Sequence, residues 1–288
     1  MNTNELLLFL WAIVLGLIIG SFLNVVIHRL PIMLQRQWHE QCSEWLIINS
    51  SVSITKSKKN NPLYNLAFPY SHCPQCLHSL RWFENIPLVS FIYQHRCCRH
   101  CGGKISWRYP LVELATALMS GLIVYHFGFT LQGGMGLIFI WLLIPLAIID
   151  LEHQLLPDNL TLLLLWLGLL RSLYEPTLSP SAAIVGAIVG YLFLWLIYWL
   201  VKILTAKEGM GYGDFKLLAA LGSWLGWSML PLVVLIASLT GAITGIILIT
   251  KGRDRQQPIP FGPFLAGAGA ISFLWGKELM AYYQFWGF

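Results

Sequence analysis

Eight long apolar runs dominate this chain and restrict it to a fold that lies in a lipid bilayer. Of its 288 residues, 57% are hydrophobic and 11% are charged, and a soluble domain of that composition would expose large apolar patches. A helix needs roughly 17 to 25 apolar residues to cross a bilayer. The runs that come near this length are residues 5–27, 111–128, 133–150, 159–174, 181–204, 214–230, 231–250 and 261–284. We therefore predict an all-α polytopic membrane protein with about eight transmembrane helices.

The basic residues predict which side of the membrane each connection occupies. Residues 1–5 contain no Lys or Arg, whereas His28 and Arg29 follow the first run, so the charge bias is the reverse of a signal peptide. We expect the first run to be retained as a helix with its N-terminus outside. Alternating crossings then place four connections in the cytoplasm, at residues 28–110, 151–158, 205–213 and 251–260. Positive cytoplasmic loops beside anionic lipid account for the net charge of +5 without a nucleic-acid partner.

Two aspartates at the ends of apolar runs are the candidate catalytic residues. Asp150 closes the third run, and Asp214 begins the sixth, in the string Gly211-Tyr-Gly-Asp214. A carboxylate at the edge of a membrane helix is costly and by default indicates function. Two crossings separate the pair, so both are expected at the cytoplasmic side, where they could share one proton and activate a water. This pattern favours an aspartic hydrolase.

A structural alternative exists for these aspartates. Glycines before an aspartate at a helix start also form an ordinary N-cap, and Asp158, which follows Pro157, fits a cap more strongly than Asp214 does. Lys216, two residues after Asp214, has two open interpretations. It could pair with a carboxylate or anchor its helix at the lipid headgroups.

Five of the six cysteines lie in one polar stretch, as Cys73-Pro-Gln-Cys76 and Cys97-Cys98-Arg-His-Cys101. The pairs Cys73/Cys76 and Cys98/Cys101 have the spacing of a tetrahedral four-thiolate zinc site, whereas disulfides are disfavoured in a reducing cytosol. Cys97 could replace Cys98. Further candidate ligands are His72, His78, His95 and His100. We expect a structural metal, because four thiolates leave no open position for water and a small lobe has little core of its own.

The change from apolar to polar composition divides the chain into three regions. Residues 1–27 form the first transmembrane helix, residues 28–110 a cytoplasmic lobe with the tetracysteine motif, and residues 111–288 the membrane core with both aspartates. Within the lobe, Lys56, Lys58 and Lys59 with Asn60-Asn-Pro62 indicate an exposed turn or loop. In the core, Gly186-x-x-x-Gly190 and Gly241-x-x-x-Gly245 suit close helix packing.

Taken together, these features resemble the prepilin peptidases, or type IV leader peptidases, of the GxGD aspartic protease class. The matching strings run along nearly the whole chain: Gly20-Ser-Phe-Leu-Asn24, His28-Arg-Leu-Pro31, Gln37-Trp38, both CxxC pairs, Asn85-Ile-Pro-Leu-Val-Ser90, Ser106-Trp-Arg-Tyr-Pro110 with Glu113, both aspartate segments and Phe261-Gly-Pro-Phe264. One departure is Leu77, which follows the first cysteine pair where a glycine is usual; the second pair is followed by Gly102.

The resemblance implies a function and a location. It implies that Asp150 and Asp214 are the catalytic pair and that the lobe belongs to the long, zinc-bearing form. Its substrates would be precursors of type IV pilins and type II secretion pseudopilins, cleaved at the cytoplasmic face of the bacterial inner membrane between a basic leader and an apolar helix. It also implies N-methylation of the new N-terminus with S-adenosylmethionine. Carboxylates that could meet the basic leader are Glu40, Glu44, Glu84, Glu113 and Glu152.

Two other classes of protein remain open on the sequence. A transporter would also carry carboxylates and glycine-broken helices, but related halves and charges near the bilayer midplane are expected there. A non-catalytic, zinc-containing membrane scaffold would need the cysteines but neither aspartate.

Overall fold

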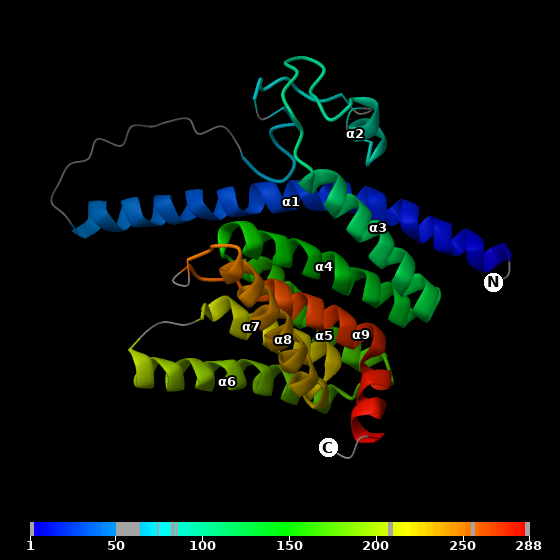
Figure 1. Ribbon diagram of the computed structural model, residues 1–288, viewed down its shortest axis with the longest axis vertical. Helices are drawn as coiled ribbons and strands as arrows, with labels where there is room; N and C mark the ends of the chain where they lie inside the picture. The colour runs from blue at the N-terminus through cyan, green and yellow to red at the C-terminus, as the bar shows by residue number, and fades with distance from the viewer. Residues whose placement is uncertain are drawn as a thin grey trace. The chain divides into compact units, whose positions relative to one another are not determined.

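The computed structural model describes residues 3–49, 64–73, 75–81, 84, 86–206, 210–254 and 257–285. Its helices are α1 (Thr3–Asn49), α2 (Val89–Tyr93), α3 (Arg108–Phe127), α4 (Leu131–His153), α5 (Asp158–Tyr174), α6 (Pro180–Thr205), α7 (Tyr212–Leu225), α8 (Leu230–Thr250) and α9 (Gly262–Phe285), as Figure 1 shows. The described residues contain no strand beyond two isolated β-bridges. The predicted all-helical class is therefore confirmed.

The chain divides into two compact units, residues 14–117 in one and residues 1–13 with 118–288 in the other. In the larger unit, α7 is the central helix. It packs against α5, α6 and α9, and α9 packs in turn against α4 and α8. Nearly every residue of α7 from Asp214 to Trp224 is buried. A helix that is apolar on all sides belongs inside a bundle and not at its surface.

Small residues let α6 approach this central helix. A Cβ atom added to Gly186 would lie 2.3 Å from the carbonyl oxygen of Gly222, and one added to Gly190 would lie 2.6 Å from that of Leu218. Both distances are shorter than real Cβ contacts, so the two backbones touch only because no side chain intervenes. The packing interpretation of the Gly186 and Gly190 spacing is confirmed.

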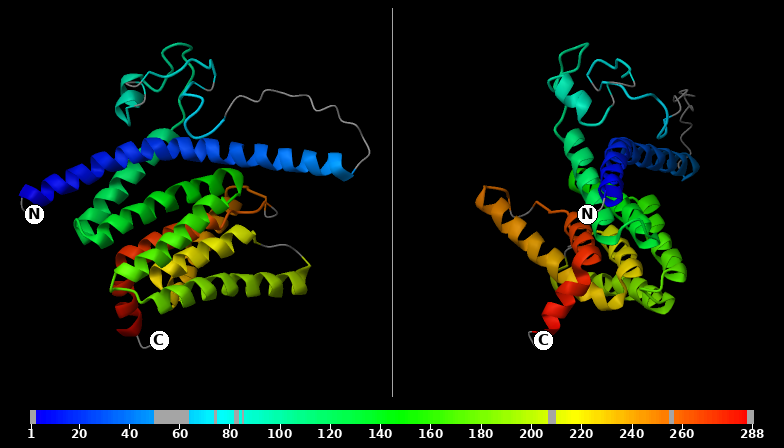
Figure 2. Two further views of the ribbon diagram at one scale, coloured as in Figure 1. Left: turned by 180° about the vertical axis from the view of Figure 1, so that it is seen from behind. Right: turned by 90° about the vertical axis from the view of Figure 1, so that its right-hand side faces the viewer.

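The predicted sixth run is shorter in the structure than in the sequence. α7 ends at Leu225 instead of residue 230, because the next residue, Gly226, adopts a positive φ of 81° that is incompatible with a right-handed helix. Glycine adopts this conformation at little cost, so it commonly ends helices. A short 3-10 segment, Trp227–Met229, then leads into α8. α8 packs mainly against α9 and otherwise projects from the helices of its unit (Figure 2), so most of its surface is exposed within the described chain.

Among the described residues, five helices are long and apolar enough to cross a membrane. They comprise Glu5–Trp45 of α1, then α3, α4 and α6, and the segment Trp227–Thr250 that includes α8. Of the other runs expected to span, α5 has 17 residues and α7 has 14. At 1.5 Å per residue, α7 is about 21 Å long, less than a hydrocarbon core of about 30 Å.

α1 is longer than expected. The apolar run ends at residue 27, yet the helix continues to Asn49 with Pro31 inside it. The residues after Pro31 include good helix formers such as Leu, Met, Gln, Arg and Glu, with no glycine among them. The length of an apolar run indicates which residues can enter a bilayer. It does not indicate where the helix ends, which depends on helix-breaking residues such as glycine and proline.

The smaller unit contains α1 from residue 14, the start of α3, and the polar lobe between them. Arg29 of α1 is buried and holds the lobe by hydrogen bonds to backbone carbonyls. Its Nη1 donates to Asn65 at 3.0 Å and to Leu66 at 3.2 Å, and its Nη2 donates to Pro69 at 2.5 Å. The expected loop at Lys56–Pro62 lies outside the described residues.

Candidate active site and metal centre

Asp150 lies in the last turn of α4. The helix ends at Gln154, whose φ of 52° turns the chain while its backbone N–H donates to the carbonyl of Asp150. The Asp150 side chain is only 6% exposed. The helix end thus presents a buried carboxylate and not one that extends into solvent.

Asp214 is also buried, at 7% exposure, in the first turn of α7. The N-cap residue is Gly211, and no side chain caps the helix. The ordinary N-cap interpretation of Asp214 is therefore wrong, because the N-cap position belongs to Gly211, whose backbone instead hydrogen-bonds the Asp214 carboxylate from within the first turn. α7 begins at Tyr212, two residues earlier than the sequence indicated, so Asp214 lies inside the helix.

A second buried contact fixes the Asp150 carboxylate. The backbone N–H of Gly262, at the start of α9, donates to Asp150 Oδ2 at 3.0 Å. A Cβ atom at this glycine would lie 2.6 Å from the same oxygen. Only glycine lets the α9 backbone come this close to the carboxylate.

Leu156 connects the two aspartate segments. Its side chain would lie 2.7 Å from a Cβ added to Gly213 and 3.2 Å from one added to Gly262. The segments that carry Asp150 and Asp214 therefore meet on one leucine, and the two carboxylates are close enough to interact electrostatically. The sequence did not identify Leu156 and Gly262 as contacts of the aspartates. A signal for the special role of Gly262 was present in the prolines at 258, 260 and 263 that surround it.

Asp158 has a different surrounding. It is the first residue of α5 and does not cap it, because the N-cap is Pro157 and no side chain makes a cap hydrogen bond. The cap interpretation of Asp158 is wrong. Instead, Lys216 Nζ donates to both Asp158 oxygens, at 2.7 and 2.8 Å, in a pair that is partly open to solvent. Of the two interpretations of Lys216, pairing with a carboxylate is the one observed.

The four predicted cysteines come together in the lobe. The sulfur atoms of Cys73, Cys76, Cys98 and Cys101 all lie within 4.8 Å of one another. Two of the separations are 3.8 Å, between Cys73 and Cys101, and 4.0 Å, between Cys76 and Cys98. Tetrahedral zinc with Zn–S bonds of about 2.3 Å requires sulfurs about 3.8 Å apart. The donor set and its spacing therefore fit such an ion.

Cys97 and the histidines remain outside this cluster among the described residues. Cys97 instead forms an isolated β-bridge with Lys104. His78 and His100 stack on each other with their ring centres 4.5 Å apart. The alternative in which Cys97 replaces Cys98 is therefore not the arrangement that the structure holds.

The two cysteine turns have the same backbone design. Leu77 N–H donates to Cys73 O at 2.9 Å, and Gly102 N–H donates to Cys98 O at 2.8 Å. Both residues adopt left-handed backbone conformations, with φ of 59° at Leu77 and 69° at Gly102. The first turn thus has the same geometry as the second, although it has a leucine where the second has a glycine. The Cβ atom of Leu77 makes this left-handed conformation sterically unfavourable.

The four thiols of the cluster influence one another's pKa values. Burial raises the pKa of the Cys73 thiol, but hydrogen bonds from nearby backbone and thiol groups outweigh this and lower the pKa to about 7. At Cys101 the backbone hydrogen bond with Gly103 lowers the pKa, yet desolvation and the neighbouring thiols raise it to about 12. Four sulfurs this close resist common ionisation unless a cation lies among them.

Two protein-family models match separate parts of the chain. Residues 14–127 match the family model of the bacterial peptidase A24 N-terminal domain, and residues 137–246 match the type IV leader peptidase family. No solved structure matches the chain.

Three curated relatives are all called prepilin leader peptidase/N-methyltransferase. The protein of Stutzerimonas stutzeri is 49% identical over 282 residues, which cover 98% of this chain and 95% of the relative. The protein of Pseudomonas aeruginosa is 49% identical over 288 residues, covering 99% and 97%. The protein of Legionella pneumophila is 43% identical over 269 residues, covering 93% and 91%.

Proposed function

The chain belongs to the prepilin leader peptidase/N-methyltransferase family, and on that premise we propose which residues perform the reaction and where. We propose a membrane endopeptidase that removes the basic leader from type IV prepilins and type II secretion pseudopilins. Its catalytic pair is Asp150 and Asp214. The same protein then N-methylates the new N-terminus.

The single observation that carries the catalytic assignment is the meeting of two buried, unpaired carboxylates. Asp150 and Asp214 lie on neighbouring segments in contact with Leu156, and neither belongs to an ion pair within the described part of the chain. A structural buried carboxylate normally has a cationic partner. Two such groups without cations are placed for proton chemistry.

The proposed reaction uses both carboxyl groups and one water. The ionised carboxylate takes a proton from water as the water oxygen bonds to the scissile carbonyl carbon. The protonated partner donates to the carbonyl oxygen, where negative charge develops. When the tetrahedral intermediate collapses, the aspartate that took the water proton gives it to the leaving amine as the C–N bond breaks, and the other aspartate takes back a proton from the hydroxyl of the intermediate. The pair titrates as one unit, so neither aspartate is assigned as the base.

The membrane arrangement is a further part of the proposal. The chain is a multi-pass membrane protein of a bacterial family, and we place it in the inner membrane with eight crossings. The basic connections then face the cytoplasm, as do both aspartates and the cysteine lobe. A substrate with a basic leader and an apolar helix would present its cleavage point at this surface.

We assign the four-cysteine cluster a structural zinc ion, bound by Cys73, Cys76, Cys98 and Cys101. Support comes from the sulfur separations and from the all-thiolate donor set, which leaves no coordination position for a catalytic water. The methyl donor is S-adenosylmethionine, which supplies an electrophilic methyl group on a sulfonium.

Substitution of each aspartate tests the catalytic assignment. Asp150→Asn and Asp214→Asn keep side-chain volume but remove the proton chemistry, so each is expected to lower prepilin cleavage about 100- to 10,000-fold. The matched control is Asp158→Asn, which alters a carboxylate of a neighbouring segment that is ion-paired at the surface. Cleavage is measured as precursor converted in membranes at equal enzyme amounts. Full cleavage by either of the first two variants would contradict the two-aspartate mechanism.

A further inference from the structure

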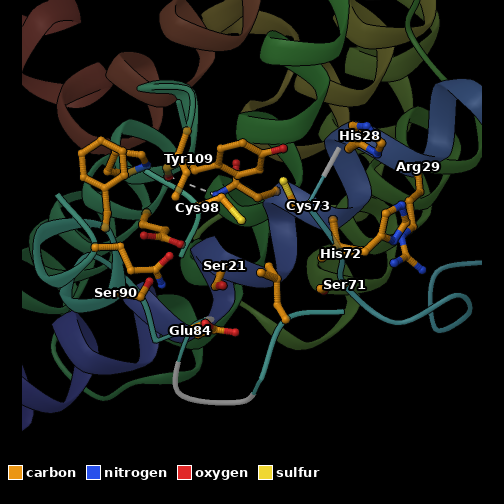
Figure 3. Close-up of a pocket in the computed structure, with 18 of the residues that line it drawn as sticks. Ser21, His28, Arg29, Ser71, His72, Cys73, Glu84, Ser90, Cys98 and Tyr109 are labelled. Atoms are coloured by element: carbon orange, nitrogen blue, oxygen red, sulfur yellow. Dashed lines mark hydrogen bonds between the residues drawn. The ribbon is translucent and has the colours of Figure 1, made fainter. Parts of the chain in front are cut away.

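The smaller unit contains a cavity of about 200 Å³ between α1, the start of α3 and the lobe. Figure 3 shows residues from these segments around it, among them Ser21, Ser71, Glu84, Ser90 and Tyr109. Neither Asp150 nor Asp214 lines this cavity. All residues that line it belong to the smaller unit, whereas both aspartates belong to the larger one.

A buried carboxylate forms part of its wall. Glu113 is 8% exposed, and its Oε2 accepts a hydrogen bond of 2.9 Å from the backbone N–H of Leu88. Leu88 adopts a φ of 56°, a left-handed conformation that is unfavourable for leucine. Strain of this kind persists where the surroundings enforce it and often accompanies function. The contacts of Glu113 also exclude its interpretation as a solvated or headgroup-facing glutamate.

An unsatisfied acceptor lies in the same wall. Asn24 is 4% exposed, and its Nδ2 donates to the Tyr109 carbonyl at 3.1 Å. Its Oδ1 is buried without a hydrogen-bond partner. A buried acceptor without a partner is unfavourable, so a ligand that brings a hydrogen-bond donor or a positive charge to Asn24 Oδ1 would stabilise the site.

The charges around the cavity favour a cation. Two carboxylates line it, Glu113 and Glu84, and the latter is oriented by a 2.8 Å hydrogen bond from the Arg81 backbone. The positive lining group Arg29 already donates to three backbone carbonyls of the lobe. His28 and His72 complete the titratable groups that are not cysteines or tyrosines. Aromatic rings, which also favour cations, come from Tyr64, Phe91 and Tyr109.

We propose that this cavity binds the sulfonium-bearing methionyl part of S-adenosylmethionine, with Glu113 and Asn24 toward its positive charge. The inference rests on the N-methyltransferase half of the proposed function and gives that half a location. Sites for whole drug-sized ligands measure about 300–1,000 Å³, so a cavity of about 200 Å³ suits the charged part of the donor. In the proposed topology, Asn24 and Glu113 lie at cytoplasmic helix ends, where this soluble donor is accessible.

A charge comparison tests this site without relying on methyl transfer. S-adenosylhomocysteine is the same molecule without the methyl group, and its sulfur is neutral. Equilibrium dialysis of the full-length protein in detergent should show S-adenosylmethionine bound about tenfold more tightly than S-adenosylhomocysteine, as one charge-assisted contact predicts. Glu113→Gln should remove most of that preference. The matched control Glu44→Gln, an exposed carboxylate of α1 in the same unit, should keep it.

A second variant, Asn24→Ala, keeps the proposal testable if Glu113→Gln does not fold. Asn24→Ala leaves Glu113 in place and should weaken binding of S-adenosylmethionine, while bound zinc reports that the smaller unit is folded and prepilin cleavage reports the larger one. If the wild type binds the donor and both variants bind it with unchanged preference, the cavity assignment is overturned and the proposed function stands. If the wild type binds no donor and methylates no peptide, the methyltransferase half of the proposed function fails instead.

Discussion

The aspartate site and the cysteine cluster are built in opposite ways. Asp150, Asp214 and Gly262 lie at the ends of helices in a packed bundle, so helix packing and the hydrogen bond from Gly262 to Asp150 determine where the carboxylates lie. The four cysteines lie in two turns, each closed by one isolated β-bridge, and Cys73 is the one cysteine of the cluster that is buried. Helix packing thus positions the chemistry in one region, whereas we propose that an ion holds the shape of the other.

Removal of the metal is the strongest way to test this difference. Cys76→Ser, or exposure to a strong chelator, should unfold the lobe, because a structural zinc contributes about 10–16 kcal/mol to a small metal-dependent fold. The readouts are zinc content and protease sensitivity within residues 64–107. Cleavage by the protein that remains in the membrane should fall far less than in Asp214→Asn. Cys42→Ser, at an exposed cysteine outside the cluster, is the matched control. A metal-free wild type of full stability would refute the comparison.

The reverse test is a small change at the aspartate site. In Gly262→Ala, the new Cβ would lie 2.6 Å from Asp150 Oδ2, so the carboxylate or the start of α9 must move. A displacement near 1 Å can cost about 100-fold in rate, so we expect cleavage to fall by that order while zinc content stays unchanged. Gly267→Ala in the same helix has nothing within 4 Å of the new Cβ and should cleave normally. Equal rates for both variants would show that the Gly262 contact does not position Asp150.

The sequence predicted what is encoded locally. The CxxC spacing brought the correct four sulfurs together, because each pair lies within one tight turn. The placement of Asp150 and Asp214 near helix ends followed from the limits of the apolar runs. The same runs misjudged the end of α1 and of α7, since hydropathy reports affinity for lipid and does not report where a helix breaks.

Long-range backbone contacts were beyond the reach of the sequence. The hydrogen bond between Gly262 and Asp150 joins residues 112 positions apart. Its donor is a main-chain N–H, which every residue except proline carries, so no side-chain type marks it. The cavity at Asn24 and Glu113 has the same origin, because it forms only when α1, α3 and the lobe fold together.

The smallest expected effect concerns the two cysteine turns. Leu77 is 73% exposed and holds a φ of 59°, whereas Gly102 holds the equivalent place at 69°. A leucine in the left-handed conformation destabilises the folded state by about 1–2 kcal/mol. Replacing it with glycine removes this strain, but the greater conformational freedom of glycine in the unfolded chain offsets about half of the gain. Leu77→Gly should therefore stabilise the metal-bound lobe by up to about 1 kcal/mol, which is roughly fivefold slower zinc release to a chelator.

The converse substitution in the second turn should have the opposite effect on zinc release. Gly102→Leu introduces the same penalty in the second turn, where a new Cβ would meet nothing within 4 Å, so zinc release should become faster by a similar factor. The double variant Leu77→Gly with Gly102→Leu should return close to the wild-type rate, because the two turns share one geometry and the strain only changes place. Prepilin cleavage should stay constant in all three variants, since Leu77 and Gly102 belong to the smaller unit and both aspartates belong to the larger one. Slower release in Gly102→Leu would show that the turns are not equivalent and that Leu77 contributes a contact of its own.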